Sequence, residues 1–253
     1  LDTTPLAAAC KDGNISVVKE LLKAGADINP QGASDTPLTA ACEGGHIILV
    51  KELLVAGADI NPQGRNNTPL IAACKDGYMS IVREILNAGA HVNPQSESDT
   101  PLRAACEGGH MSVVMELLEA GADINPQGKY DTPLTAACGN GHMDVVKKLI
   151  EVGADTNPNG RNTTPLIAAC KDGNISVLKE LLKAGSDISP QGHITTPLIA
   201  ACEGGHMSVV KELLEAGADM NQKSEVDTPL TAAYKGGYMS LVNELLEAGS
   251  NLC

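Results

Sequence analysis

The sequence contains no Phe and no Trp, and it has only four Tyr among 253 residues. Ala, Val, Ile and Leu must therefore form the interior, which favours thin layers of closely packed helices over a core built on aromatic rings. No apolar run reaches the ~18 residues that a membrane-spanning helix needs. No secretory signal precedes the first helix pattern. We therefore expect neither membrane insertion nor secretion.

The chain also lacks any run of like charge, although its formal net charge is −13. Nucleic acids and anionic membranes bind proteins through basic surfaces. Neither is therefore expected as a partner. A distributed negative charge of this size is typical of a surface that favours solubility.

Disulfides and metal sites are not expected, even though the chain has eight Cys. Seven of these recur at one position, every 32 residues: Cys10, Cys42, Cys74, Cys106, Cys138, Cys170 and Cys202. Packed helices lie ~8–10 Å apart, which exceeds the ~7 Å between Cα atoms that a disulfide tolerates. We expect small buried thiols and a reducing, cytoplasmic location.

No catalytic constellation is present. Four His follow a Gly at one repeat position, where other repeats hold Asn or Tyr: His46, His110, His142 and His206. Such exchange indicates hydrogen bonding in a turn rather than metal ligation. The spacing of a phosphate-binding loop is absent, and no nucleophile and base are paired. We expect no metal, no cofactor and no enzyme activity.

What the chain does contain is an internal repeat. Thr-Pro-Leu begins at Thr4, Thr36, Thr68, Thr100, Thr132, Thr164, Thr196 and Thr228, without insertion or deletion. The repeats run near 1–30, 31–62, 63–94, 95–126, 127–158, 159–190, 191–222 and 223–253. A fixed period of this length predicts a stack in which each repeat buries its apolar face against its neighbours.

Each repeat predicts two helices. Thr4 is a preferred N-cap and Pro5 a preferred first helical residue, and the short helix that follows ends at Gly13. The second helix has one apolar stripe at helical period, formed by Val17, Val18, Leu21 and Leu22. Gly25 ends it in the left-handed conformation.

Together these motifs resemble ankyrin repeats. The resemblance rests on TPL, the AA or AC pair, VVKELL and AGADIN, and it covers all eight repeats. It implies one all-α domain, 1–253, in which eight helix-turn-helix repeats stack into a solenoid with finger loops. It also implies a non-catalytic scaffold that binds a partner protein or peptide on its concave face and fingers.

The chain departs from the ankyrin pattern in three ways. Its period is 32 rather than the family's 33, and the missing residue falls in a proline-containing finger, so we expect short turns there. The His that follows Thr-Pro-Leu in the family is absent. The end repeats have no polar caps, which indicates either a longer array that has been cut or ends that meet another copy.

The positions that vary between repeats give the predicted partner site. Arg103 and Tyr130 belong to the residue types that most often anchor interfaces. The full predicted set is Arg65, Lys75, Arg103, Glu107, Lys129, Tyr130 and Arg161. Lys11, Glu43, Lys75 and Glu107 also alternate in sign at one repeat position, which predicts charge pairs between adjacent repeats and a groove of mixed polarity.

Two further expectations follow from the resemblance. Ankyrin repeats with Leu five residues before Asp, and Asn two residues after it, are acceptors for asparagine hydroxylation, and Asn29 and Asn125 match. The alternative is that each Asn only orders its turn. As an alternative to partner binding, near-identical repeats also fit a structural spacer or tether within a longer array.

Overall fold

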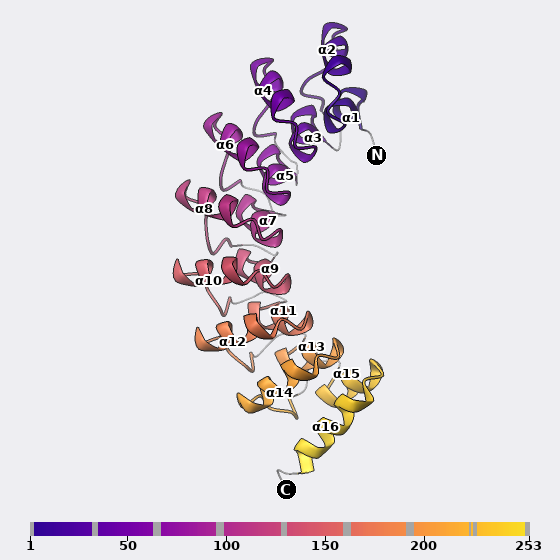
Figure 1. The fold of residues 1–253 in the computed structure, drawn as a ribbon, viewed down its shortest axis with the longest axis vertical. Coiled ribbons are helices and arrows are strands. Elements are labelled where there is room, and N and C mark those ends of the chain that lie inside the picture. The colour runs from indigo at the N-terminus through magenta and orange to yellow at the C-terminus, as the bar shows by residue number, and fades with distance from the viewer. Residues whose placement is uncertain are drawn as a thin grey trace. The chain divides into compact units, whose positions relative to one another are not determined.

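The computed structural model describes residues 3–31, 35–62, 67–94, 99–127, 131–158, 163–190, 195–222, 224 and 227–250. Within these ranges the structure is all-helical and contains no strand (Figure 1). The chain divides into two compact units, residues 1–123 and 124–253. Each compact unit is described by itself.

Every repeat contributes a first helix and a second helix. The first compact unit holds α1 (Pro5–Lys11), α2 (Ile15–Lys23), α3 (Pro37–Glu43), α4 (Ile47–Val55), α5 (Pro69–Lys75), α6 (Met79–Asn87), α7 (Pro101–Glu107) and α8 (Met111–Glu119). The second holds α9 (Pro133–Gly139), α10 (Met143–Glu151), α11 (Pro165–Lys171), α12 (Ile175–Lys183), α13 (Pro197–Glu203), α14 (Met207–Glu215), α15 (Pro229–Lys235) and α16 (Met239–Ser250).

The ends of the helices follow from local chemistry. The hydroxyl of Thr36 accepts a hydrogen bond from the backbone N–H of Thr39 at 3.0 Å, and each first helix has an equivalent threonine cap. Gly25, with φ +83°, follows α2 in the left-handed region that favours glycine. The predicted caps and helix pairs are therefore confirmed, although α1 ends at Lys11, two residues before Gly13.

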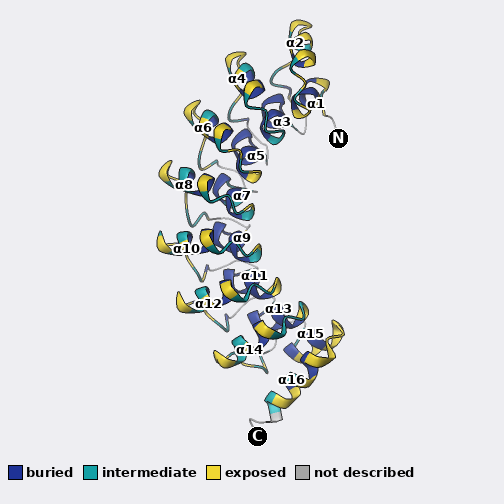
Figure 2. Ribbon diagram, in the orientation of Figure 1, coloured by how far each residue is buried: buried dark blue, intermediate teal, exposed yellow. Residues whose placement is uncertain are grey.

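The core lies between successive first helices, with the second helices packed beside them (Figure 2). On α4, Leu49, Val50 and Leu53 are completely buried, and Leu54 is half-buried. Three positions of the predicted stripe are thus buried in α4, whereas in α2, where the stripe was predicted from Val17, Val18, Leu21 and Leu22, only Val18 is buried and Val17 is 43% exposed. The seven repeated Cys are also buried and carry free thiols, as predicted.

In several repeats, a side chain bonds to the preceding repeat. The Nε2 atom of His46 lies 3.0 Å from the carbonyl oxygen of Lys11, at the end of the preceding first helix. His110 and His206 make the same contact with Lys75 and Lys171, both at 2.9 Å. These His residues therefore bond to backbone carbonyls between repeats, as the exchange with Asn predicted.

A second inter-repeat contact uses the Asn that ends each AGADIN motif. The Nδ2 atom of Asn29 donates to the carbonyl of Gly57 at 3.0 Å, and its Oδ1 accepts from the N–H of Asp59 at 2.7 Å. We call this two-bond contact the asparagine staple. Further staples are made by Asn61, Asn93, Asn125 and Asn157. The Asn thus bonds beyond its own turn, to the next repeat.

The second helices are joined by ion pairs between neighbouring repeats. Lys19 lies 2.9 Å from Glu52, and Lys51 lies 3.4 Å from Glu84. The same spacing along the chain gives Arg83–Glu116, Lys179–Glu212 and Lys211–Glu244. Exposed pairs of this kind contribute ~0–1 kcal/mol each, so they matter more as a surface pattern than for stability.

Some expectations are not settled by this fold. The finger tips, for which short turns are predicted, lie outside the described residues. The assignment of 1–253 to one domain stays a prediction, as do the eight repeat boundaries.

The last repeat exposes several apolar or aromatic side chains, namely Leu230, Tyr234, Tyr238, Met239 and Leu246.

Candidate functional site: a polar groove in the first compact unit

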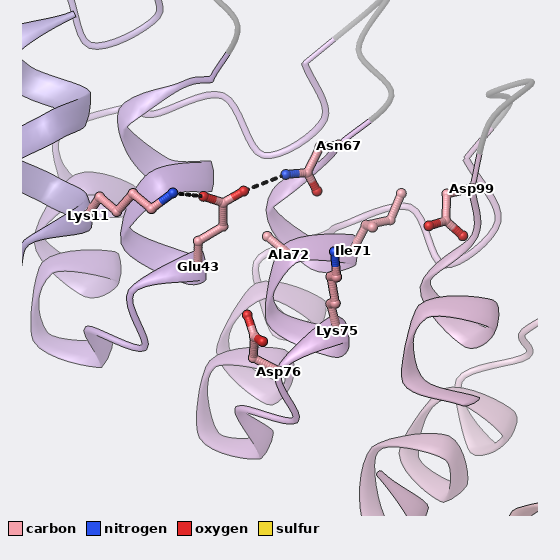
Figure 3. A pocket seen from close by; sticks show the side chains of 8 residues that line it. All are labelled: Lys11, Glu43, Asn67, Ile71, Ala72, Lys75, Asp76 and Asp99. Carbon is pink, nitrogen blue, oxygen red and sulfur yellow. Dashed lines mark hydrogen bonds and ion pairs between the residues drawn. The ribbon is translucent and has the colours of Figure 1, made fainter. Parts of the chain in front are cut away.

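A groove with a volume of about 540 Å³ crosses the first helices of the first compact unit (Figure 3). Its lining comes from α1, α3 and α5 and from the residues that precede α5 and α7. The lining residues are Lys11, Glu43, Asn67, Ile71, Ala72, Lys75, Asp76 and Asp99. One face of the repeats thus brings together side chains that are up to 88 residues apart in the sequence (99 − 11).

One wall of the groove is a closed polar network. The ammonium of Lys11 lies 3.1 Å from Glu43, and the Nδ2 atom of Asn67 donates to the same carboxylate at 2.7 Å. The hydrogen bond with Glu43, together with its charge, raises the pKa of Lys11. The predicted charge pairing between adjacent repeats is confirmed for Lys11 and Glu43. The carboxylate of Glu43 is therefore already bonded within the chain, to Lys11 and Asn67.

The opposite wall is held by Arg103. Its Nε and Nη2 atoms bond to the two oxygens of Asp99 at 2.6 and 2.8 Å, and Nη2 also bonds to Glu107 at 3.0 Å. Two-bond contacts between guanidinium and carboxylate are strong and directional. The bonds to Asp99 raise the pKa of Arg103 above its already high value. With only 22% of its side chain exposed, Arg103 is fixed in place.

The centre of the groove combines an apolar floor with two exposed charges. Ile71 and Ala72 are each 3% exposed and form the floor, while Lys75 and Asp76 stand exposed at the end of α5. Among the described residues, the ammonium of Lys75 makes no ion pair. Lys75 is therefore the lining cation that is available to an incoming carboxylate.

The groove combines several kinds of contact. Its described lining has charged and amide side chains around an apolar floor, and it contains no His, Cys or Ser. Within the described parts of the chain, no group of three His, Cys, Asp or Glu is placed to hold a metal ion. The groove offers charge, hydrogen bonds and an apolar floor to a ligand.

The structure brings together some of the predicted partner-binding residues. Lys75 lines the groove, and Arg103 and Glu107 lie bonded together beside Asp99. The other predicted residues, Arg65, Lys129, Tyr130 and Arg161, lie outside the described residues. Asn29 and Asn125, the predicted hydroxylation sites, both form asparagine staples.

Only Lys75 of the eight lining residues belongs to the predicted partner-binding set; the polar residues Asn67, Asp76 and Asp99 are among those that do not. The spacing of Asp99 and Arg103, four residues apart around a helix start, was a visible signal, because side chains at this spacing meet on one helix face. Asn67 bonds to a residue 24 positions away, so no local pattern indicated its role.

Comparisons with known proteins agree with this architecture. A family model described as ankyrin repeats (3 copies) matches residues 1–64, 46–128, 125–192 and 189–253. The crystal structure of the human ASB11 ankyrin repeat domain is similar, with a TM-score of 0.72 and 30% sequence identity. That match covers 86% of this chain and 99% of the other. The comparison with curated proteins gave no match.

Proposed function

The chain belongs to the ankyrin repeat family, whose members generally act as protein–protein interaction modules, and we propose that its first compact unit binds a partner protein through the groove around Lys75. The bound element is a peptide segment that places a carboxylate on Lys75 and an apolar side chain over Ile71. The role is binding and not catalysis, and no cofactor takes part.

The observation that carries this proposal is which charged side chains of the groove are already paired within the chain. Glu43 and Asp99 are already bonded to Lys11 and Arg103, whereas Lys75 is exposed and without an ion pair among the described residues. A charged hydrogen bond to a partner is worth ~1.5–3 kcal/mol, which corresponds to about 10–100-fold in affinity. Lys75 is therefore the residue on which binding should depend most.

The groove alone is smaller than a stable interface, which buries ~800 Å² on each partner. The partner must also contact neighbouring surface, and Arg103 and Glu107 lie next to the groove on α7. We retain as proposed contacts the predicted residues that the structure does not describe: Arg65, Lys129, Tyr130 and Arg161.

The chain contains a matched control for Lys75. Helices α5 and α11 have the same sequence, PLIAACK, and end at Lys75 and Lys171, which are both exposed. The flanking residues differ: α11 has Gly139, Thr163 and Thr195 where α5 has Glu43, Asn67 and Asp99. Lys171→Glu therefore makes the same charge change on the same helix without the groove residues.

The experiment is affinity capture from native cell extract with quantitative mass spectrometry. We expect at least one protein whose recovery falls about tenfold or more with Lys75→Glu but is unchanged with Lys171→Glu. When that protein is purified, its Kd should rise by a similar factor with Lys75→Glu and stay unchanged with Lys171→Glu. A partner set that responds equally to the two variants, or to neither, would contradict the proposal.

The regular inter-repeat contacts favour a second candidate, a structural spacer or tether. Asparagine staples and ion pairs between second helices recur at successive repeats, so extension would load equivalent junctions in turn. When the chain is stretched, the repeats should then unfold one after another, each at a similar force. If the chain is a spacer, the proteins captured from cell extract should be the same with Lys75→Glu as with the unaltered chain.

Two smaller proposals follow from the family and the fold. Asn29 and Asn125 are proposed hydroxylation sites, and mass spectrometry of natively produced protein would show the added oxygen. A cytoplasmic location is proposed from the free thiols. In the described part of the chain, no helix combines the length and apolar character needed to cross a bilayer.

A further inference from the structure

The end of α5 places two opposite charges in the groove, those of Lys75 and Asp76. Both side chains are exposed, and both line the groove (Figure 3). Within the described residues, neither side chain makes an ion pair or a hydrogen bond. They do not pair with each other either, because consecutive side chains on a helix do not face each other. The groove therefore offers a ligand one available cation and one available anion.

Each of these charges stands one helical turn beyond a different residue of the apolar floor. Lys75 follows Ile71 by four residues, and Asp76 follows Ala72 by four residues. Residues at this spacing are neighbours on the surface of a helix. Ile71 and Ala72 are both buried. The floor therefore leads to the cation along one line of α5 and to the anion along a second line beside it.

The charged walls of the groove are balanced within the chain. The carboxylate of Glu43 lies 3.1 Å from the ammonium of Lys11. The two oxygens of Asp99 bond to Arg103 at 2.6 and 2.8 Å. Because each of these pairs is neutral as a whole, the walls favour neither an acidic nor a basic ligand. The unbalanced charges of the groove are the two at the end of α5, and they have opposite signs.

We propose that the groove selects a peptide segment with charges of both signs, which places a carboxylate on Lys75, a basic side chain on Asp76 and an apolar side chain between them over the floor. This inference rests on the proposed function of the groove and adds a second anchor to it. A purely acidic segment would cover Asp76 without giving it a hydrogen-bond donor, and a covered charge without a partner opposes binding. Asp76 therefore determines specificity, and Lys75 alone does not.

Helix α11 supplies the matched control. It has the same sequence as α5, and it ends at the same pair of charges, Lys171 and Asp172, which are both exposed. The chain around α11 has no charged residue at the positions equivalent to Glu43 and Asp99. Asp172→Lys therefore makes the same charge change as Asp76→Lys, at the end of an identical helix that lacks the charged walls.

The end of α5 does not require an aspartate. The residue at this position is Gly44 after α3 and Gly108 after α7, and both of these helices end in the same way. A lysine at the C-terminal end of a helix is also favourable to the helix dipole. Thermal unfolding of Asp76→Lys should therefore match that of the unaltered chain, so that a change in binding reports on the groove.

The probe is a library of short random peptides displayed on phage and selected on the whole chain. We expect the selected peptides to have an acidic and a basic residue at one fixed separation, with an apolar residue between them. Fluorescence anisotropy with synthetic copies then gives the Kd. Asp76→Lys should raise the Kd about tenfold or more, and Asp172→Lys should leave it unchanged.

Charge exchange tests whether the contact with Asp76 is direct. When the basic residue of a selected peptide is changed to Glu, binding to the unaltered chain should weaken about tenfold or more. Asp76→Lys should restore the binding of that altered peptide, and Asp172→Lys should not. Rescue at only one of two equivalent helix ends excludes a general effect of the net charge.

The outcomes separate this inference from the proposed function. If Lys75→Glu weakens the selected peptides and Asp76→Lys does not, the groove binds through its cation alone, which overturns the inference and leaves the proposed function intact. An equal response to Asp76→Lys and Asp172→Lys also overturns the inference. If the selection yields no peptide that responds to Lys75→Glu, the inference and the proposed function are both wrong.

Discussion

The two compact units use the same repeat, but their junctions are not built from identical residues. In the first compact unit, Asn29, Asn61 and Asn93 each form an asparagine staple with the following repeat. In the second, Asn125 and Asn157 form staples, and the next position of the series is Ser189, which has a hydroxyl in place of the amide. Because stacked repeats gain stability junction by junction, such an exchange acts on one place without altering the fold.

The first helices show the same lesson for binding. Helices α5 and α11 are identical in sequence, yet only the residues around α5 include Glu43, Asn67 and Asp99. Each helix supplies an apolar floor and a lysine, and the residues around the helix determine which charged groups surround that lysine. The copies of this repeat therefore differ mainly at surface positions, while the buried residues stay nearly constant.

The largest predicted effect is a difference between the two compact units in how their stability depends on pH, and it arises from their buried thiols. Burial raises the pKa of Cys10 to about 11 and of Cys106 to about 12, and it also raises the pKa of Cys42 and Cys74. In the second unit, burial raises the pKa of Cys170 and brings that of Cys202 to about 12. The last repeat has Tyr234, which is 69% exposed, at this position.

These thiols predict a loss of stability in alkali. In the unfolded chain a thiol ionises near pH 8.5, whereas in the folded chain it stays neutral to higher pH. Above pH ~9 the unfolded state therefore holds fewer protons, and the free energy of unfolding falls by ~1.4 kcal/mol per pH unit for each such thiol. Stability should be flat below that pH and should fall more steeply in the first compact unit.

Pulsed alkylation of the cysteines in urea, read by mass spectrometry between pH 8 and 10.5, measures this difference for each repeat. Replacing Cys42, Cys74 and Cys106 with Ala should flatten the slope in the first compact unit and leave that of the second unchanged. A stability that does not change with pH over this range would contradict the assignment.

The next prediction removes one asparagine staple from each compact unit. Asn61→Ala removes the bonds to the carbonyl of Gly89 and the N–H of His91, which should cost about 1–2 kcal/mol for two exposed hydrogen bonds. Asn157→Ala removes the bonds to the carbonyl of Gly185 and the N–H of Asp187 in the second unit, and it should cost a similar amount. Hydrogen exchange should accelerate at the amide of His91 in the first variant and at that of Asp187 in the second. Unchanged exchange at both amides would show that the staples carry no net stability.

Much of the fold was predictable because its signals are local. Thr4, Pro5 and Gly25 act within one turn of the backbone, and the stripe that includes Val50 and Leu53 follows from helical period. The role of Asn29 was only half predictable. Its recurrence every 32 residues marked the turn, but its bonding partners lie 28 and 30 residues away in the next repeat. Such contacts depend on how the repeats stack.

The site was less predictable than the fold for the same reason. Lys75 was identified from the sequence, but its availability depends on Glu43 and Asp99 being occupied by other cations. Arg103 was predicted as a partner anchor, and that role stays a prediction, with the structure showing it bonded to Asp99 and Glu107.

The smallest predicted effect concerns one buried hydroxyl in the second compact unit. Ser186 is 9% exposed, and among the described residues its hydroxyl has no hydrogen-bond partner, whereas the equivalent Ala58 is 7% exposed. An unsatisfied buried hydroxyl costs ~1 kcal/mol or more, so Ser186→Ala should stabilise the second compact unit by about that amount, and Ala58→Ser should destabilise the first by about as much. Urea denaturation of the two variants measures both changes. If both substitutions shift stability in the same direction, the hydroxyl of Ser186 is satisfied in solution, and the predicted contrast between Ser186 and Ala58 is wrong.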